Sequence, residues 1–222
     1  MQKSVELGLD VLVRSKFRAL KGLTIGLICN PTAVDGALRH AADLLHAAPG
    51  VKLRSLFGPE HGVRGEAQYM AAVGDERDRR TGLPAFSLYG QTKDSLRPAP
   101  AQLAGLDALV FDIQDIGSRY YTYQATMMLC LEAAAQAKLR FVVLDRPNPI
   151  GGAVEGPALR PGFESFCGLH DLAPRHGMTV GELCLMFKAE RKLDVEVEVV
   201  ACEGWRKRQC FDETGLPWVM PS

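Results

Sequence analysis

The sequence predicts an α/β fold, a mostly parallel β-sheet with helices on both faces. Six short apolar segments of strand length, rich in β-branched and aromatic residues, recur along the 222 residues. Segments with apolar residues at helical spacing lie between them. Parallel strands need crossover connections, which are usually helices, so this alternation favours a parallel sheet.

The predicted strands differ in how far they are buried. They cover residues 23–29, 51–57, 85–89, 107–113, 140–145 and 195–200. The segments 107–113 and 140–145 are apolar on both faces apart from their ends, which is typical of central strands. The segment 195–200 alternates valine with glutamate and therefore predicts an edge strand with one face in water.

Helices are predicted before and between these strands. They cover residues 5–13, 37–47, 92–104, 121–137 and 179–190. Thr179 and Glu182 have the spacing of a capping box at the start of the last helix. Residues 146–178 are rich in proline and glycine, which indicates a long functional loop or a linker between lobes.

This pattern predicts two regions. Residues 1–160 are expected to form an α/β domain that carries most of the site. Residues 161–222 are expected to complete that domain and to begin a smaller, truncated C-terminal domain. The second expectation rests on the end of the chain, which stops directly after the apolar segment GLPWVMPS.

Charge and composition exclude several classes of protein. Lysine plus arginine and aspartate plus glutamate are both 26, without long runs of one sign, so nucleic acid and anionic membranes are not expected partners. The six cysteines lack CxxC spacing, which argues against structural zinc or a disulfide framework. Glu6 and Asp10 interrupt the N-terminal apolar residues, so a cytoplasmic chain is expected. A periplasmic or secreted protein whose signal peptide was removed would look the same.

Polar side chains follow five of the predicted strands. In an open α/β sheet the ligand crevice lies outside the carboxyl ends of the strands, where the loops converge. These side chains are Asn30, Glu60, His61, Arg64, Glu66, Tyr89, Asp112, Gln114, Asp115, Arg119, Tyr120, Tyr121, Asp145, Arg146 and Asn148. Turn and cap chemistry explains any one of them, but five such loops together indicate a site.

Glu60 and His61 lie in a tightly constrained loop. Pro59 fixes one backbone angle, and Gly58 and Gly62 allow a ligand to approach the backbone closely. A partly desolvated carboxyl beside an imidazole is suited to act as a general acid on a leaving oxygen. The alternative is that the two side chains pair with each other or cap a helix.

Other chemistries have weaker support. Glu60, His61, Asp112, Asp115 and His176 have side chains that bind metals, but their spacing matches no zinc signature, so no metal is expected. The sequence contains neither a G-x-S-x-G elbow nor a phosphate-binding glycine motif, and no nucleotide cofactor is expected.

Three tyrosines beside Arg119 leave two interpretations open. Tyr120, Tyr121 and Tyr123 would offer a stacking surface to a sugar ring, because an aromatic face packs against the C–H face of a pyranose. Alternatively they begin the 121–137 helix and pack inward.

At these same residues the sequence resembles a known family. The matching strings are NPTAVD (30–35), LFGPEHGVRGEAQ (56–68), TGLPAFSLYG (81–90), LVFDIQDIGSRYYTY (109–123), VVLDRPNPIGG (142–152), EGP (155–157), RHGMTVGEL (175–183) and FDETGLPWVMPS (211–222). They look like those of the YbbC/NamZ family, whose characterised members are exo-β-N-acetylmuramidases. The resemblance implies a Rossmann-like domain that shares its cleft with a smaller C-terminal domain. It also implies release of non-reducing-end N-acetylmuramic acid from peptidoglycan fragments, without a nucleotide cofactor.

The resemblance implies a catalytic role for Glu60, and the chemistry of the loops suggests roles for the other residues. Glu60 matches the glutamate of the GPEHG motif, and we expect it to be the general acid, with His61 orienting it and Asp112 or Asp115 as the second carboxylate. The expected substrate-binding residues are Asn30, Arg64, Arg119, Tyr120, Tyr121, Asp145, Arg146, Asn148 and His176. Among them, the three arginines are candidates to bind the lactyl carboxylate. A muropeptide-binding module without activity and a metal-dependent hydrolase are the alternatives.

Overall fold

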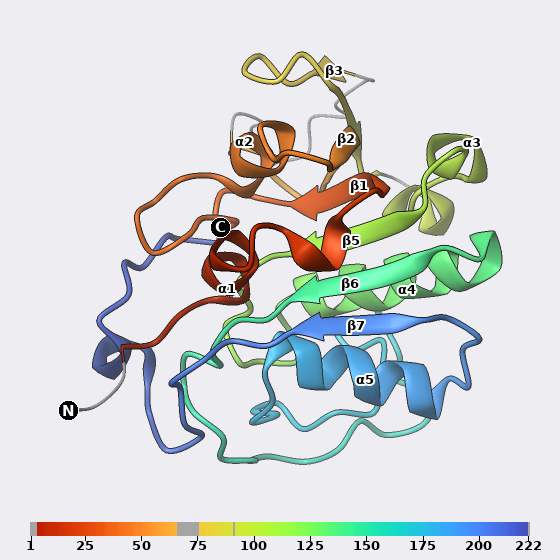
Figure 1. Ribbon diagram of the computed structural model, residues 1–222. Helices are drawn as coiled ribbons and strands as arrows, with labels where there is room; N and C mark the ends of the chain where they lie inside the picture. Colours follow the sequence, from red (N-terminus) through yellow and green to blue (C-terminus); the bar gives the residue numbers. More distant parts are fainter. Residues whose placement is uncertain (1–3, 66–75, 91, 222) are drawn as a thin grey trace.

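The structure, a computed structural model, describes residues 4–65, 76–90 and 92–221. Its strands are β1 (Thr24–Cys29), β2 (Lys52–Gly58), β3 (Glu76–Arg77), β4 (Pro84–Ser87), β5 (Ala108–Asp112), β6 (Arg140–Leu144) and β7 (Val197–Val200). They form one sheet in the order β3-β4-β2-β1-β5-β6-β7 (Figure 1). Only the short β3 is antiparallel to its neighbour. The predicted α/β class with a mostly parallel sheet is confirmed.

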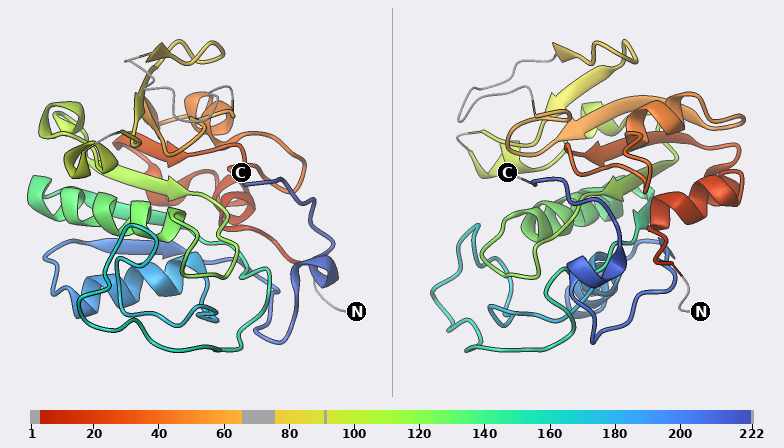
Figure 2. Two further views of the ribbon diagram at one scale, coloured as in Figure 1. Left: turned by 180° about the vertical axis from the view of Figure 1, so that it is seen from behind. Right: turned by 90° about the vertical axis from the view of Figure 1, so that its left-hand side faces the viewer.

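The helices form two layers around this sheet. They are α1 (Gly8–Arg14), α2 (Ala41–His46), α3 (Pro100–Leu103), α4 (Tyr123–Ala137) and α5 (Val180–Glu190), with short 3-10 helices η1 (Arg18–Leu20), η2 (Lys93–Leu96) and η3 (Phe211–Thr214). The core on the α4 and α5 face contains Leu109 and Phe111, whereas Val110 faces the core beneath α1 and α2. Figure 2 shows the sheet between the two layers. Strand β5 is therefore buried on both faces, as its sequence predicts.

The strand order creates a crevice at a defined place. Without β3, the order is that of the doubly wound Rossmann fold, in which the chain starts in the middle and reverses direction once. The reversal occurs between β1 and β5, so the loops after these two strands separate to opposite faces. Ligand-binding residues are therefore expected first at the carboxyl ends of β1 and β5.

Two predicted helices are shorter than expected. The 37–47 helix begins only at Ala41, because Leu38 has a left-handed φ of 61° and the His40 ring accepts the Ala42 N–H at 3.2 Å as an N-cap. The 92–104 helix is divided into η2 and α3, since prolines at 98 and 100 disfavour helical geometry in the residues before them. The two-residue strand β3 was not predicted.

The capping box, the edge strand and the irregular 146–178 region agree with the predictions. Thr179 and Glu182 form the expected capping box, with hydrogen bonds of 3.2 and 3.0 Å. Strand β7 lies at one end of the sheet, as predicted for an edge strand. Residues 146–178 contain no helix or strand and are held by isolated bridges to Arg175. Among the residues described, no helix combines the length and the apolar character needed to cross a bilayer.

Candidate active site at the carboxyl edge of the sheet

The loops after β1 and β5 are joined by hydrogen bonds at the switch point. Asn30 follows β1, and its Oδ1 accepts hydrogen bonds from the N–H (3.0 Å) and the hydroxyl (2.6 Å) of Thr32. The Thr32 hydroxyl oxygen in turn accepts a hydrogen bond of 2.9 Å from the N–H of Gln114. All three side chains are buried. The two loops therefore form one rigid edge.

Asp112, the last residue of β5, is part of a buried ion pair. Its Oδ1 accepts a hydrogen bond of 2.6 Å from Arg146 Nε, and Arg146 Nη2 donates to the Val34 carbonyl over 2.9 Å. The exposed fractions of Asp112 and Arg146 are 0% and 3%. Burial raises the pKa of Asp112, whereas the Arg146 charge acts in the opposite direction. Neither side chain reaches the surface.

Asp115 pairs with a histidine from a distant part of the chain. Its Oδ2 accepts hydrogen bonds from Gly117 N–H (2.6 Å) and His176 Nε2 (2.9 Å). The Nδ1 of His176 accepts the Met178 N–H at 3.2 Å, so the proton of the neutral ring is on Nε2. Asp115 Oδ1 is buried and has no hydrogen-bond partner among the described residues. The histidine therefore fixes the orientation of the carboxylate and leaves one oxygen unpaired.

Glu60 and His61 lie in the turn that follows β2, next to this edge. Both side chains are half-buried, in contrast to the buried Asp112 and Asp115. His61 and Gly62 have left-handed φ values of 70° and 75°, and the Gly62 N–H closes the turn on the Pro59 carbonyl at 3.0 Å. The Glu60 carboxyl is thus accessible to a ligand from a constrained turn.

Arg64 is engaged in a network of ion pairs. Its Nε donates to Asp78 Oδ1 (2.5 Å), and its Nη2 donates to Asp43 Oδ1 (2.8 Å). Burial alone would raise the pKa of Asp78, but hydrogen bonds from Arg64 and Thr81 hold it below its ordinary value. Arg64 therefore ties the turn after β2 to α2. Glu66 lies outside the described residues.

The tyrosines and Arg119 divide between two environments. Tyr120 is 62% exposed, whereas Tyr123 is buried at the start of α4 and contacts Tyr121 edge to face at 5.1 Å. Arg119 is half-exposed, and its Nη1 donates to the carbonyls of Pro157 and Leu172. Tyr120 therefore fits the interpretation as an exposed stacking surface. Tyr123 fits the interpretation as a residue that packs inward at the start of α4.

Asp145 and Asn148 stabilise the structure beside the edge. Asp145 Oδ1 accepts the Gly181 N–H at 2.8 Å at the start of α5, and burial raises its pKa. Asn148 donates to the Met178 carbonyl over 3.0 Å and accepts the Ile150 N–H at 3.1 Å. The sequence placed both residues at the correct edge, but their hydrogen bonds are made within the protein.

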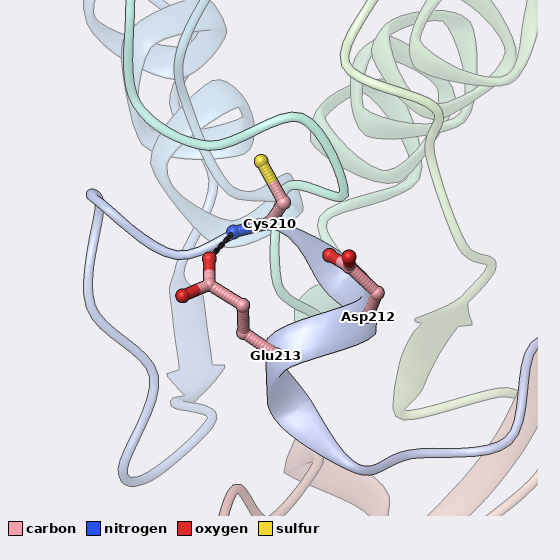
Figure 3. Close-up of side chains that lie close together, drawn as sticks. All are labelled: Cys210, Asp212 and Glu213. Atoms are coloured by element: carbon pink, nitrogen blue, oxygen red, sulfur yellow. Dashed lines mark hydrogen bonds between the residues drawn. The ribbon is translucent and has the colours of Figure 1, made fainter.

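The side chains that could share a metal ion gather at η3. In the described part of the chain, the only three such side chains close enough to share an ion are Cys210, Asp212 and Glu213, all exposed. Figure 3 shows that they surround the start of η3, where Glu213 accepts the Cys210 N–H at 2.8 Å. Such a capping box has a structural explanation and is remote in sequence from Glu60.

Two residues of the edge were missed by the sequence analysis. Thr32 links the two loops, and His40 is buried with Nε2 3.1 Å from the Asn30 carbonyl oxygen. Burial and the Arg64 charge lower the pKa of His40. No local pattern identifies either residue, because both contacts depend on the loop conformation between β1 and α2.

The edge combines one accessible acid with a fixed polar wall. Glu60 is half-buried in the turn after β2, and Asp115 is a buried carboxylate held by His176 and Gly117. Carboxyl groups in such different surroundings are typical of general acid–base catalysis.

Comparisons with known proteins identify the family of the chain. The family model described as "Exo-beta-N-acetylmuramidase NamZ, N-terminal" matches residues 25–222. The peptidoglycan beta-N-acetylmuramidase NamZ of Bacillus subtilis (strain 168) is 48% identical over 219 residues, which are 98% of this chain and 52% of that protein. The chain thus spans about half the length of this curated relative.

Two crystal structures of DUF1343 family proteins from Bacteroides fragilis NCTC 9343 are also similar. One has a TM-score of 0.90 and 43% identity, covering 99% of this chain and 55% of its own. The other has a TM-score of 0.79 and 32% identity, covering 94% of this chain and 55% of its own. The chain belongs to the family of the N-terminal part of the exo-β-N-acetylmuramidase NamZ.

Proposed function

We propose that the full-length protein containing this chain is an exo-β-N-acetylmuramidase that acts on peptidoglycan fragments, with Glu60 as its general acid. The observation that carries the proposal is the difference in exposure among the candidate carboxyl groups. Glu60 is half-buried on a constrained turn, whereas Asp112 and Asp115 are buried. The activity named for the B. subtilis relative supports the substrate class.

In this mechanism Glu60 protonates the glycosidic oxygen as the bond to the sugar breaks. A second carboxylate then acts as base, nucleophile or stabiliser of the oxocarbenium-like transition state. Each of the two buried carboxylates has one oxygen without a hydrogen-bond partner among the described residues. Asp115 is the better candidate, because its other oxygen is held by His176 and Gly117 and not by an arginine cation. Asp112 is engaged with Arg146 at zero exposure and serves the structure of the edge.

Among the three candidate arginines, we assign recognition of the lactyl carboxylate to Arg119, because the other two are already paired with carboxylates. Arg64 already binds two carboxylates, and Arg146 is enclosed with Asp112. Arg119 is half-exposed. Both hydrogen bonds that its side chain makes to described residues are donated by Nη1. Its Nε and Nη2 thus remain as donors for a carboxylate, and the exposed Tyr120 beside it is suited to stack on the sugar.

The test is hydrolysis of a nitrophenyl β-N-acetylmuramide by the full-length protein, with the corresponding glucosaminide as control. Wild type is expected to release the chromophore from the muramide only, and Glu60→Gln is expected to lose this activity. No release by a folded wild type would favour a muropeptide-binding module. Activity that chelators abolish would favour a metal-dependent hydrolase. Full activity of Glu60→Gln would move the acid to another carboxyl group.

A further inference from the structure

The switch-point crevice is occupied by a distant part of the same chain. After η3, residues 215–221 run back to the carboxyl ends of β1 and β5 (Figure 1). There the Pro221 carbonyl accepts hydrogen bonds from the Tyr123 hydroxyl (2.6 Å) and from Asn30 Nδ2 (3.4 Å). Asn30 follows β1 and Tyr123 begins the helix after β5, so the two donors come from the two sides of the crevice.

Both donors are held in place before they meet this carbonyl. The Asn30 amide cannot turn, because its Oδ1 already accepts two hydrogen bonds from Thr32. Tyr123 is buried and packs edge to face against Tyr121. Pro221 is also buried, so water does not compete for its carbonyl. The Asn30 amide and the Tyr123 hydroxyl, with the Pro221 carbonyl that they hold, are called the clamp below.

The rest of the 215–221 segment contacts mainly residues close to it in the sequence. Leu216 N–H bonds to Thr214, and the Trp218 indole contacts Met220 sulfur at 3.3 Å. The Trp218 ring also packs edge to face on Phe211 of η3, with ring centroids 4.8 Å apart. Trp218 and Met220 are exposed. Among the described residues, hydrogen bonds from this segment to the sheet and its helices are made through the Pro221 carbonyl alone.

The clamp is close to the proposed acid. Strands β1 and β2 pair in parallel with Ile28 beside Phe57, so Asn30 leaves the sheet next to the turn that carries Glu60. Burial raises the pKa of Tyr123, and the negative charge of Glu60 acts in the same direction. Asn30 therefore joins the Pro221 carbonyl to the loop that borders the Glu60 turn.

We propose that Asn30 and Tyr123 are positioning residues that fix the 215–221 segment in the switch-point crevice and thereby fix the wall beside Glu60. The crevice that holds a dinucleotide in other Rossmann folds is filled here by the chain itself. The ligand is consequently displaced toward the loop after β2. The effect on Glu60 rests on the proposed function, whereas the clamp does not.

The experiment uses the full-length protein with 5-fluorotryptophan, in which the fluorine resonance of Trp218 is identified by its loss in Trp218→Phe. Tyr123→Phe removes one donor, and Asn30→Asp replaces the other by an oxygen while keeping the acceptor for Thr32. The control is Thr126→Val, which removes a hydroxyl from the same helix that donates to Thr122 at 3.3 Å.

In both clamp variants the Trp218 resonance is expected to narrow and to move toward its unfolded position, whereas Thr126→Val leaves it unchanged. The kcat for the muramide is expected to fall about tenfold or more with KM nearly constant, since misplacement by about 1 Å can cost ~10²-fold. An unchanged Trp218 resonance in both variants would overturn the clamp. A mobile segment with normal kcat would overturn its positioning role. An inactive wild type whose variants still release Trp218 would retain the clamp and reject the proposed function.

Discussion

Arg146 Nε lies 2.6 Å from Asp112 Oδ1, and both side chains are shielded from solvent beneath the carboxyl edge of the sheet. Arg146→Met should remove the partner of a buried carboxylate and lower the free energy of unfolding by about 3–5 kcal/mol at pH 7. Urea unfolding of the full-length protein measures this. Asp94→Asn, which breaks an exposed pair with Arg97, should cost less than ~1 kcal/mol.

The loss of stability in Arg146→Met should depend on pH. Burial already raises the pKa of Asp112, and loss of Arg146 removes the charge that opposes this rise. A carboxyl whose folded pKa is raised contributes stability below its unfolded pKa and loses it as pH increases through the folded value. The deficit of Arg146→Met should therefore be smaller at pH 5 than at pH 8. An equal deficit at both values would show that Asp112 is not ionised beside Arg146.

The contribution of Asp78 to stability should depend on pH in the opposite direction. Although burial acts to raise it, hydrogen bonds from Arg64 and Thr81 hold the pKa of Asp78 below its ordinary value. Its contribution to stability is present above the unfolded pKa of about 4 and is lost as pH falls toward the folded value. The stability difference between wild type and Asp78→Asn should be large at pH 7 and shrink below pH 4. A difference that stays constant to pH 3 would contradict the ion pair.

The fold could be predicted because its signals are local. Apolar runs identify the six parallel strands, and Thr179 with Glu182 identifies the start of α5. Pro98 and Pro100 disfavour a single helix over 92–104, and the prediction of one helix did not take them into account. The start of α2 depends on the left-handed Leu38, and β3 depends on pairing with β4, so neither has a local signature.

The site could be predicted only in part. Loops after parallel strands must converge on one edge, and this rule placed Glu60, Asp112 and Asp115 together. It could not assign partners, because Arg146 and His176 reach their carboxylates from 34 and 61 residues away. For the same reason the rule could not identify the carboxylate partners of Arg64, which come from α2 and the turn after β3.

Arg119 should determine the preference for muramate. In Arg119→Ala, the ratio of kcat/KM for the muramide over the glucosaminide should fall about 10- to 100-fold, the value of charged hydrogen bonds worth ~1.5–3 kcal/mol. Arg175→Ala is the control, because Arg175 also holds the 146–178 loop through the Ile150 carbonyl. If Arg175→Ala lowers the ratio as much, the loop and not the Arg119 cation is responsible.

The turn that carries Glu60 should tolerate no side chain at Gly58. A Cβ there would lie 2.8 Å from both the Gly62 carbonyl carbon and the Val63 nitrogen, which are backbone atoms and cannot turn away. Gly58→Ala should therefore shift the turn and lower kcat by about 10²-fold, as expected when a reacting group moves by ~1 Å. Steady-state hydrolysis of the muramide by the full-length protein measures the loss.

Gly36→Ala is the matched control for this variant. A Cβ at Gly36 would meet Asp10 Oδ1 at 3.6 Å, which is an ordinary contact, so kcat should stay near the wild-type value. A folded Gly58→Ala protein with wild-type kcat would mean that the close approach of Gly58 to Gly62 does not place the acid. Because the same substitution is compared at a crowded and an open position, a loss confined to Gly58 identifies the backbone of the Glu60 turn as its cause.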